Sequence, residues 1–102
     1  MRMLKHIVLF RFKDFAEGSD KVENIRRLKS QLEALTEIIE EIEFFEVGIN
    51  LGNSDPAYDL ALLSEFRSRE DLHSYQKHPE HVKVSDFAKS VCEARAVADY
   101  IV

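Results

Sequence analysis

Apolar and polar side chains alternate along the first segment of the chain, from Lys5 to Lys13. A period of two is the pattern of a β-strand, whose successive side chains point to opposite faces of a sheet. One face of this predicted strand carries His6, Val8, Phe10 and Phe12, and the other carries Ile7, Leu9 and Arg11. Residues 42–50, 58–66 and 95–102 are predicted to form three further strands.

The segment after the first strand predicts an amphipathic helix. Its apolar residues recur at steps of three and four, the spacing of one helix face: Val22, Ile25, Leu28, Leu32 and Leu35. Asp20 followed by Glu23 resembles a capping box, so the helix is expected to begin there, after a connection over residues 14–19. We expect this helix to end near residues 39–41.

A second helical region is predicted between the last two strands. Ser68 with Asp71 three residues later is another capping signal. The His78-Pro79 pair interrupts this helix, because a proline ring pushes the preceding residue out of helical geometry. Proline suits the first turn of a helix, so a new helix is expected to start there, with Cys92 as a small core residue.

The order strand, helix, strand occurs twice along 102 residues. A chain of this length is expected to form one domain, residues 1–102. The order predicts an α+β fold of the ferredoxin-like β-α-β-β-α-β type, in which two helices cover one face of a four-stranded antiparallel sheet.

The predicted sheet is apolar on both faces, although two helices can cover only one. Large apolar side chains are adjacent in the sequence at Ile7–Phe10, Phe44–Phe45 and Leu62–Leu63. Leaving such a face in water costs roughly 25 cal/mol per Å². The pattern therefore predicts a homodimer formed by sheet-to-sheet packing. The alternative is that these side chains lie at strand ends or under the loop of residues 51–57.

Composition narrows the class of protein. The formal net charge of -5 argues against nucleic-acid binding, which needs a basic face. The first apolar run is broken by Arg11 and Lys13 and is too short for a membrane span or a signal peptide. A single cysteine excludes an internal disulfide and suits a reducing compartment, so a cytoplasmic protein is expected.

The candidate catalytic and ligand-binding residues lie in the stretch Tyr75-Gln-Lys-His-Pro-Glu-His81, together with His6 and Asp99. Histidine can take and give protons near neutral pH, tyrosine can donate to a developing oxyanion, and a carboxylate can fix a histidine tautomer. The structural alternative is that His78 faces solvent before the proline, His81 caps a backbone group and Asp99 bonds to an amide.

Other kinds of site have little support in the sequence. His78 and His81 are three residues apart, but the proline between them disturbs the alignment that a metal would need, and no HExxH pattern or cysteine ligand set is present. Nucleotide-binding and hydrolase motifs are also absent from the sequence. We expect no metal and no cofactor.

The chain resembles the stress-responsive dimeric α/β barrel (Dabb) family. The resemblance rests on the first strand Lys5–Lys13, the Tyr75-x-x-His-Pro-x-His81 element and the closing stretch Val97-Ala-Asp-Tyr100, in order and over nearly the whole chain. It implies two ferredoxin-like subunits whose sheets close into a barrel, in agreement with the fold reasoned above.

The resemblance also implies site roles. In a plant branch of the family, the olivetolic acid cyclase type, the tyrosine and second histidine of the motif are acid/base residues in an aldol cyclisation. Those roles would fall on Tyr75 and His81, with His6 in the pocket and Asp99 orienting His81. The chain departs from that branch because its first helix has no tyrosine and it has no tryptophan.

Two functions follow from these patterns. The first is a domain that binds a small hydrophobic molecule between sheet and helices, with Tyr75 and His81 as candidate catalytic residues and His6, His78 and Asp99 as candidate ligand-binding residues. The alternative is a lyase or cyclase that acts on a carbonyl-bearing, polyketide-like substrate. A dimeric module that only stabilises a partner is a third possibility.

Overall fold

The computed structural model describes residues 2–102, and its elements follow the predicted order. The main strands are β1 (Leu4–Phe12), β4 (Phe44–Ile49), β5 (Leu60–Phe66) and β6 (Cys92–Ile101). The helices are α1 (Lys21–Ala34), α2 (Arg69–Lys77) and α3 (Pro79–Val91). Shorter elements are the strands β2 (Phe15–Ala16) and β3 (Ser19–Asp20) and the 3₁₀ turn η1 (Leu35–Glu37).

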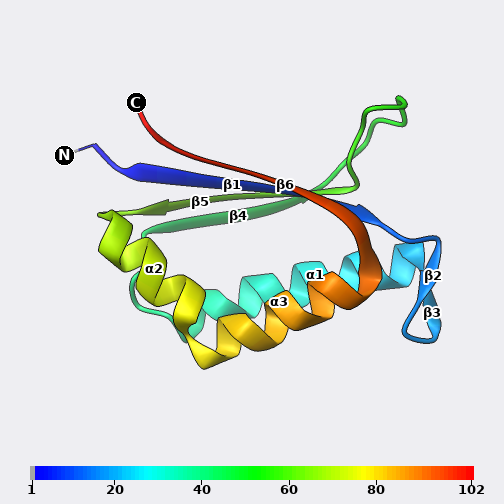
Figure 1. Cartoon of the computed structure of the whole chain (residues 1–102), viewed down its shortest axis with the longest axis horizontal. Coiled ribbons are helices and arrows are strands. Elements are labelled where there is room, and N and C mark those ends of the chain that lie inside the picture. Colours follow the sequence, from blue (N-terminus) through cyan, green and yellow to red (C-terminus); the bar gives the residue numbers. More distant parts are fainter. Residues whose placement is uncertain (1) are drawn as a thin grey trace.

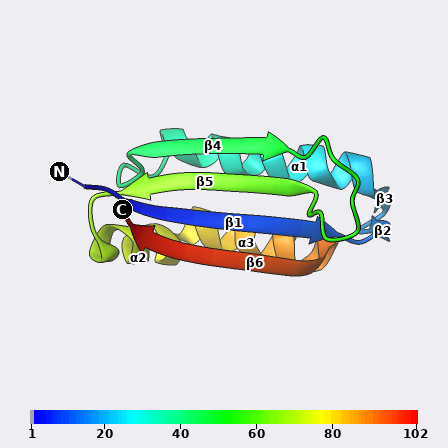
Figure 2. The same ribbon diagram turned by 90° about the horizontal axis from the view of Figure 1, so that it is seen from above.

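The four main strands form one antiparallel sheet in the order β4-β5-β1-β6 (Figure 2). Helices α1, α2 and α3 lie beneath the same face of this sheet, and no helix among residues 2–102 covers the other face (Figure 1). The predicted ferredoxin-like α+β fold is therefore confirmed.

The predicted helix starts are also confirmed. The side chain of Asp20 accepts a hydrogen bond from the backbone N–H of Glu23 at 2.9 Å, and Ser68 Oγ accepts one from Asp71 at 3.1 Å. Helix α1 ends earlier than predicted, because the chain tightens into η1 after Ala34. The apolar stripe continues through this tighter turn, which keeps Leu35 buried.

The structure differs from the prediction in the connection at residues 14–19. It contains the hairpin β2–β3, whose tip residues Glu17 and Gly18 have φ values of 50° and 75°. Two consecutive positive φ values match the twist of a tight hairpin, and glycine adopts this conformation without steric cost.

Cys92 was expected inside the last helix, and this prediction is wrong. Cys92 is the first residue of β6, which begins three residues earlier than predicted, and it pairs with Phe12 of β1. Its backbone N–H still bonds to the carbonyl of Ala88, so the chain passes from α3 into the strand without a loop. Burial raises the pKa of its thiol to about 11, so Cys92 stays protonated.

The hydrophobic core lies between the sheet and the helices. The face of β1 that meets the helices is buried: Leu4, His6, Val8, Phe10 and Phe12. Leu28 and Leu32 of α1 and Val91 of α3 join it from below. The strand pairing fixes which residues of the neighbouring strands share this side, because directly paired residues point the same way.

The opposite side of the sheet carries a row of apolar side chains. Ile7 pairs with Leu63 of β5 and Ala98 of β6, and Leu9 pairs with Ala61 and Ala96. Phe44 and Tyr100 are 42% exposed. No helix of the described chain covers this face (Figure 1).

Candidate functional site

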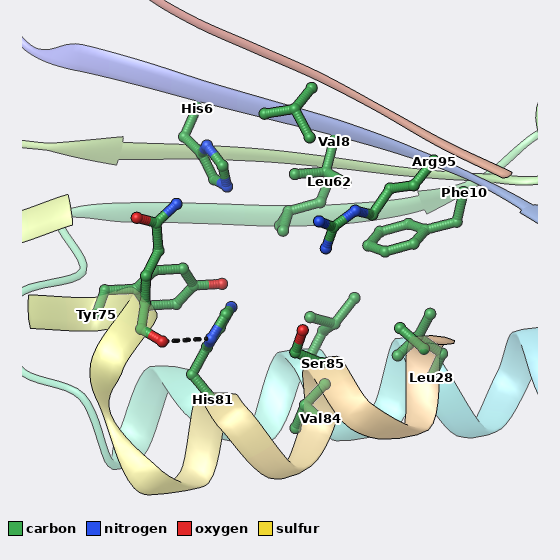
Figure 3. Close-up of a pocket in the computed structure, with 14 residues that line it drawn as sticks. His6, Val8, Phe10, Leu28, Leu62, Tyr75, His81, Val84, Ser85 and Arg95 are labelled. Atoms are coloured by element: carbon green, nitrogen blue, oxygen red, sulfur yellow. Dashed lines mark hydrogen bonds between the residues drawn. The ribbon is translucent and has the colours of Figure 1, made fainter. Parts of the chain in front are cut away.

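A pocket of about 190 Å³ opens between the sheet and the helices. Its apolar lining comes from both layers: Val8, Phe10, Leu28, Leu32, Leu62, Val84, Ala88 and Val97. Its polar lining is His6, Tyr75, Gln76, His81, Ser85 and Arg95. Figure 3 shows several of these polar side chains directed into the same space.

His81 reaches the pocket from the first turn of α3. Its Nδ1 lies 3.1 Å from the backbone oxygen of Gln76. A carbonyl only accepts, so Nδ1 carries the proton and Nε2 keeps a free lone pair. Burial lowers the pKa of His81, and the nearby Arg95 guanidinium contributes to this lowering, although the hydrogen bond to the Gln76 carbonyl opposes it. The ring is therefore neutral at pH 7, with an acceptor nitrogen available to the pocket.

Tyr75 lies beside His81, with a distance of 4.4 Å between the two ring centroids. The residue is fully buried at the C-terminal part of α2, and its hydroxyl has no hydrogen-bond partner in the described structure. Burial raises the pKa of the phenol, so the hydroxyl stays protonated and remains a donor. Figure 3 shows this hydroxyl directed into the pocket near the His81 ring.

His6 faces the same space from β1, and Asp99 holds it from β6. These two residues are directly paired across the strands, and Asp99 Oδ1 contacts His6 Nδ1. The resemblance implied that Asp99 would orient His81. The structure differs, because the carbonyl of Gln76 orients His81 and the carboxylate of Asp99 orients His6. Asp99 itself lies outside the lining of the pocket.

His78 occupies a different position from the one expected of a ligand-binding residue. Its Nδ1 accepts a hydrogen bond from the backbone N–H of Glu80 at 3.1 Å and so caps the start of α3. The side chain is outside the pocket lining. The structure thus brings together His6, Tyr75 and His81, with Asp99 behind His6, and leaves His78 in a structural position.

Sequence reasoning missed Arg95, Gln76 and Ser85. Arg95 sits two and four residues before Val97 and Asp99, so the alternation of β6 puts all three on the helix-facing side. That signal was available once the strand and its direction were assigned. Gln76 and Ser85 carried no signal, because polar residues are ordinary on a helix surface.

The arrangement is rich in hydrogen-bond donors and poor in metal ligands. Within residues 2–102, no group of three His, Cys, Asp or Glu side chains has a geometry that could hold a metal ion. The helices within residues 2–102 are too short or too polar to span a lipid bilayer. A donor hydroxyl beside a neutral imidazole can instead bind a carbonyl oxygen and exchange a proton.

Comparison with known proteins finds related proteins in the plant Arabidopsis thaliana. A stress-response A/B barrel domain-containing protein of Arabidopsis thaliana is 30% identical over 101 residues, which cover 98% of this chain and 37% of that relative. A second such protein of the same plant is 29% identical over 101 residues, which cover 97% of this chain and 47% of that relative. The chain therefore spans less than half the length of these two curated relatives.

Solved structures match over nearly the full chain. A dimeric protein with a ferredoxin-like fold from Bacteroides fragilis is 37% identical, with a TM-score of 0.85 and coverage of 98% of this chain and 96% of that one. A hydroxynitrile lyase from Passiflora edulis is 22% identical, with a TM-score of 0.82 and coverage of 98% and 93%. At the lower identity, the likeness concerns the fold alone.

The family model described as the stress responsive A/B barrel domain matches residues 4–102. These residues include every strand and helix described above. The matched range also contains the Tyr75–His81 element. The chain belongs to the stress-responsive A/B barrel domain family.

Proposed function

We propose that this chain binds a small, mostly apolar molecule with a carbonyl or similar acceptor group in the pocket between sheet and helices. The observation that carries the proposal is the buried hydroxyl of Tyr75, which lacks a partner among the described residues. A buried hydroxyl without a partner costs about 1–3 kcal/mol. A ligand oxygen that accepts from Tyr75 removes this cost, so the pocket favours a ligand with an acceptor there.

The size and lining of the pocket support a ligand of about one ring. An engineered apolar cavity of about 150 Å³ binds benzene, and the pocket here is about 190 Å³. Eight of its 14 lining residues are apolar and six are polar, so it combines apolar surface with hydrogen-bonding groups, as small-molecule sites do. Acetophenone, a single ring with one carbonyl, is therefore a suitable probe.

The binding proposal is tested by filling the pocket. Val84 is buried and lines it, whereas Val82, two residues earlier on α3, is 43% exposed and does not. We expect Val84→Phe to abolish acetophenone binding followed by NMR titration, and the matched variant Val82→Phe to leave it unchanged. Wild type without saturable binding, or equal effects of the two variants, would contradict the proposal.

A second candidate function is proton transfer on a carbonyl substrate, as in a lyase or cyclase. The observation that favours it is the pairing of a neutral His81 acceptor nitrogen with the Tyr75 donor in one pocket. In this scheme, His81 Nε2 takes a proton from the carbon beside the carbonyl while Tyr75 donates to the developing enolate oxygen. The Passiflora hydroxynitrile lyase with the same fold is a precedent for lyase chemistry on this architecture.

Deuterium incorporation into the methyl group of acetophenone tests this second function. We expect wild type to accelerate the exchange in D₂O, and both His81→Gln and Tyr75→Phe to lower the rate by about 10²-fold or more. His73→Gln, at an exposed position on α2, is the control and is expected to behave as wild type. If wild type binds acetophenone but does not accelerate exchange, the binding function stands and this catalytic function does not.

The family assignment and the uncovered sheet face also support a homodimer. We propose that two copies pack their sheets against each other through the row that includes Ile7, Leu9 and Leu63. Two solved structures of the same fold, from Bacteroides fragilis and Thermobifida fusca, are described as dimeric. Packing of this kind buries the apolar row and closes the two sheets around a shared interior.

A further inference from the structure

Arg95 is the side chain in the pocket lining that carries a permanent charge. It pairs with Phe10 across β1 and β6, so it projects to the helix-facing side of the sheet. Figure 3 shows its guanidinium directed into the pocket beside Phe10, across from the group formed by His6, Tyr75 and His81. The same pocket is otherwise lined by neutral polar and apolar groups and by titratable histidines.

Arg95 is an exposed residue of β6, and the described protein does not use its guanidinium. Within residues 2–102, no carboxylate lies within 4.0 Å of it and no hydrogen bond involves it. Two other arginines are bonded within the protein. Arg11 donates to the carbonyls of Asp55 and Ala57, and Arg67 pairs with Glu43 at 3.2 Å. Asp99 lies on the same face of β6 as Arg95, four residues further along, but its carboxylate contacts His6.

A guanidinium that lines a pocket and has no partner in the described protein favours a ligand of negative charge. A guanidinium has five donors in a planar fork that matches the two oxygens of a carboxylate. One guanidinium balances one negative charge, which fits a monocarboxylate better than a doubly charged phosphate. The acceptor position at Tyr75 is separate from Arg95, so both can be occupied by one ligand.

We propose that the pocket selects a small carboxylic acid, whose carboxylate pairs with Arg95 while its apolar part lies against Phe10, Leu28 and Leu62. This inference rests on the proposed function that the pocket binds a small apolar molecule, and it adds the charge of that molecule. Arg95 is then the residue that determines specificity. Tyr75 and His81 can then form hydrogen bonds with a second, neutral oxygen of the ligand.

The test compares two probes that share a skeleton and differ in charge, 3-phenylpropanoate and 3-phenylpropan-1-ol. A hydrogen-bonded charge pair contributes about 1.5–3 kcal/mol, so we expect wild type at pH 7 to prefer the acid by about tenfold or more. Affinity for the acid should fall as salt is added, while affinity for the alcohol should not. Both are measured by NMR titration or calorimetry.

Variants of Arg95 identify the source of the preference. Arg95→Leu keeps an apolar stem and is expected to bind the two probes equally, through loss of affinity for the acid alone. Arg95→Lys keeps the charge without the fork and is expected to retain part of the preference. Arg26→Leu removes an exposed arginine of α1 outside this pocket and should behave as wild type. Should Arg95→Leu fail to fold, Arg95→Gln serves the same purpose.

The outcomes separate this inference from the proposed function. If wild type binds the alcohol as tightly as the acid, or if Arg95→Leu weakens both equally, the selection of an acid by Arg95 is wrong and the binding function stands. If wild type binds neither probe and also fails to bind acetophenone, both are wrong. A preference for the acid that disappears in Arg95→Leu and persists in Arg26→Leu supports the inference.

Discussion

His81 is held in its neutral form by its surroundings, and this has a consequence for stability. Because burial lowers its pKa in the folded protein, the unfolded chain binds its proton first as the pH falls. The folded state is thus destabilised as the pH drops below the ordinary histidine value of about 6.5 towards the lower folded pKa. Above that window, the ring is neutral in both states and contributes no pH dependence.

Urea denaturation between about pH 5 and about pH 8 checks this expectation. We expect the free energy of unfolding to rise with pH across the window in wild type, and the rise to be smaller in His81→Gln. His73→Gln, at an exposed position, should keep the wild-type slope. An unchanged slope in His81→Gln would show that another group is responsible.

Tyr75 offers a second prediction at the scale of one atom. Tyr75→Phe removes a buried hydroxyl that has no partner in the described structure, so it removes a cost and leaves the ring packing against Phe66 and His81 in place. We expect the free energy of unfolding to stay the same or to rise by about 1 kcal/mol. Affinity for acetophenone should fall at the same time. A less stable Tyr75→Phe protein would mean that the hydroxyl is already hydrogen-bonded within the folded chain.

The junction between α2 and α3 gives a prediction at the scale of an element. His78 caps α3 through the N–H of Glu80, and Pro79 occupies the first helical turn. We expect His78→Ala to lower the free energy of unfolding by about 0.5–2 kcal/mol. His78→Asn, whose side chain can also accept this hydrogen bond, should retain most of the stability. Thermal and urea denaturation measure both.

The same variants also test the sequence-based prediction that His78 binds ligand. Because its side chain lies outside the pocket lining, His78→Ala should bind acetophenone with unchanged affinity once folded. A large loss of affinity in a folded His78→Ala protein would show that His78 contributes to ligand binding.

Much of the fold was predictable because it depends on short-range patterns. Period-two alternation located β1, β4 and β5, and the capping residues Asp20 and Ser68 located two helix starts. The short elements and the boundaries between elements were less predictable. The hairpin β2–β3 has only two residues in each strand, too few for a periodic signal. The start of β6 was misplaced because Cys92 satisfies the last helical turn and the first strand pair at once.

The site was predictable in its members and less so in their pairing. His6, Tyr75 and His81 stand out by residue type, but the partner of Asp99 depends on strand register, which places it directly opposite His6. The orientation of His81 depends on a backbone carbonyl, which no side-chain pattern reveals. Arg95 was missed because a charged residue near a predicted strand end is usually solvated.

At the scale of the whole molecule, the uncovered sheet face predicts assembly. A charge introduced at Leu63, which pairs with Ile7 in the apolar row, would have to be buried against a second copy. We therefore expect wild type to sediment as a dimer and Leu63→Glu to sediment as a folded monomer. Val22→Glu, at an exposed position of α1, is the control and should remain dimeric. A wild-type protein that stays monomeric at high concentration would contradict the proposed sheet-to-sheet dimer.

The pairing of β1 with β6 also brings the two ends of the chain together. Leu4 pairs with Ile101, and Arg2 donates to the carbonyl of Val102 at 3.1 Å. A short glycine linker can therefore join the two ends without disturbing the sheet, and new ends can be opened in the exposed segment 52–55. Such a circular permutant should fold and keep its ligand affinity, since no strand or pocket residue is cut. Because the two ends lie side by side, this domain can also be inserted within another polypeptide chain as readily as it can be fused to a terminus.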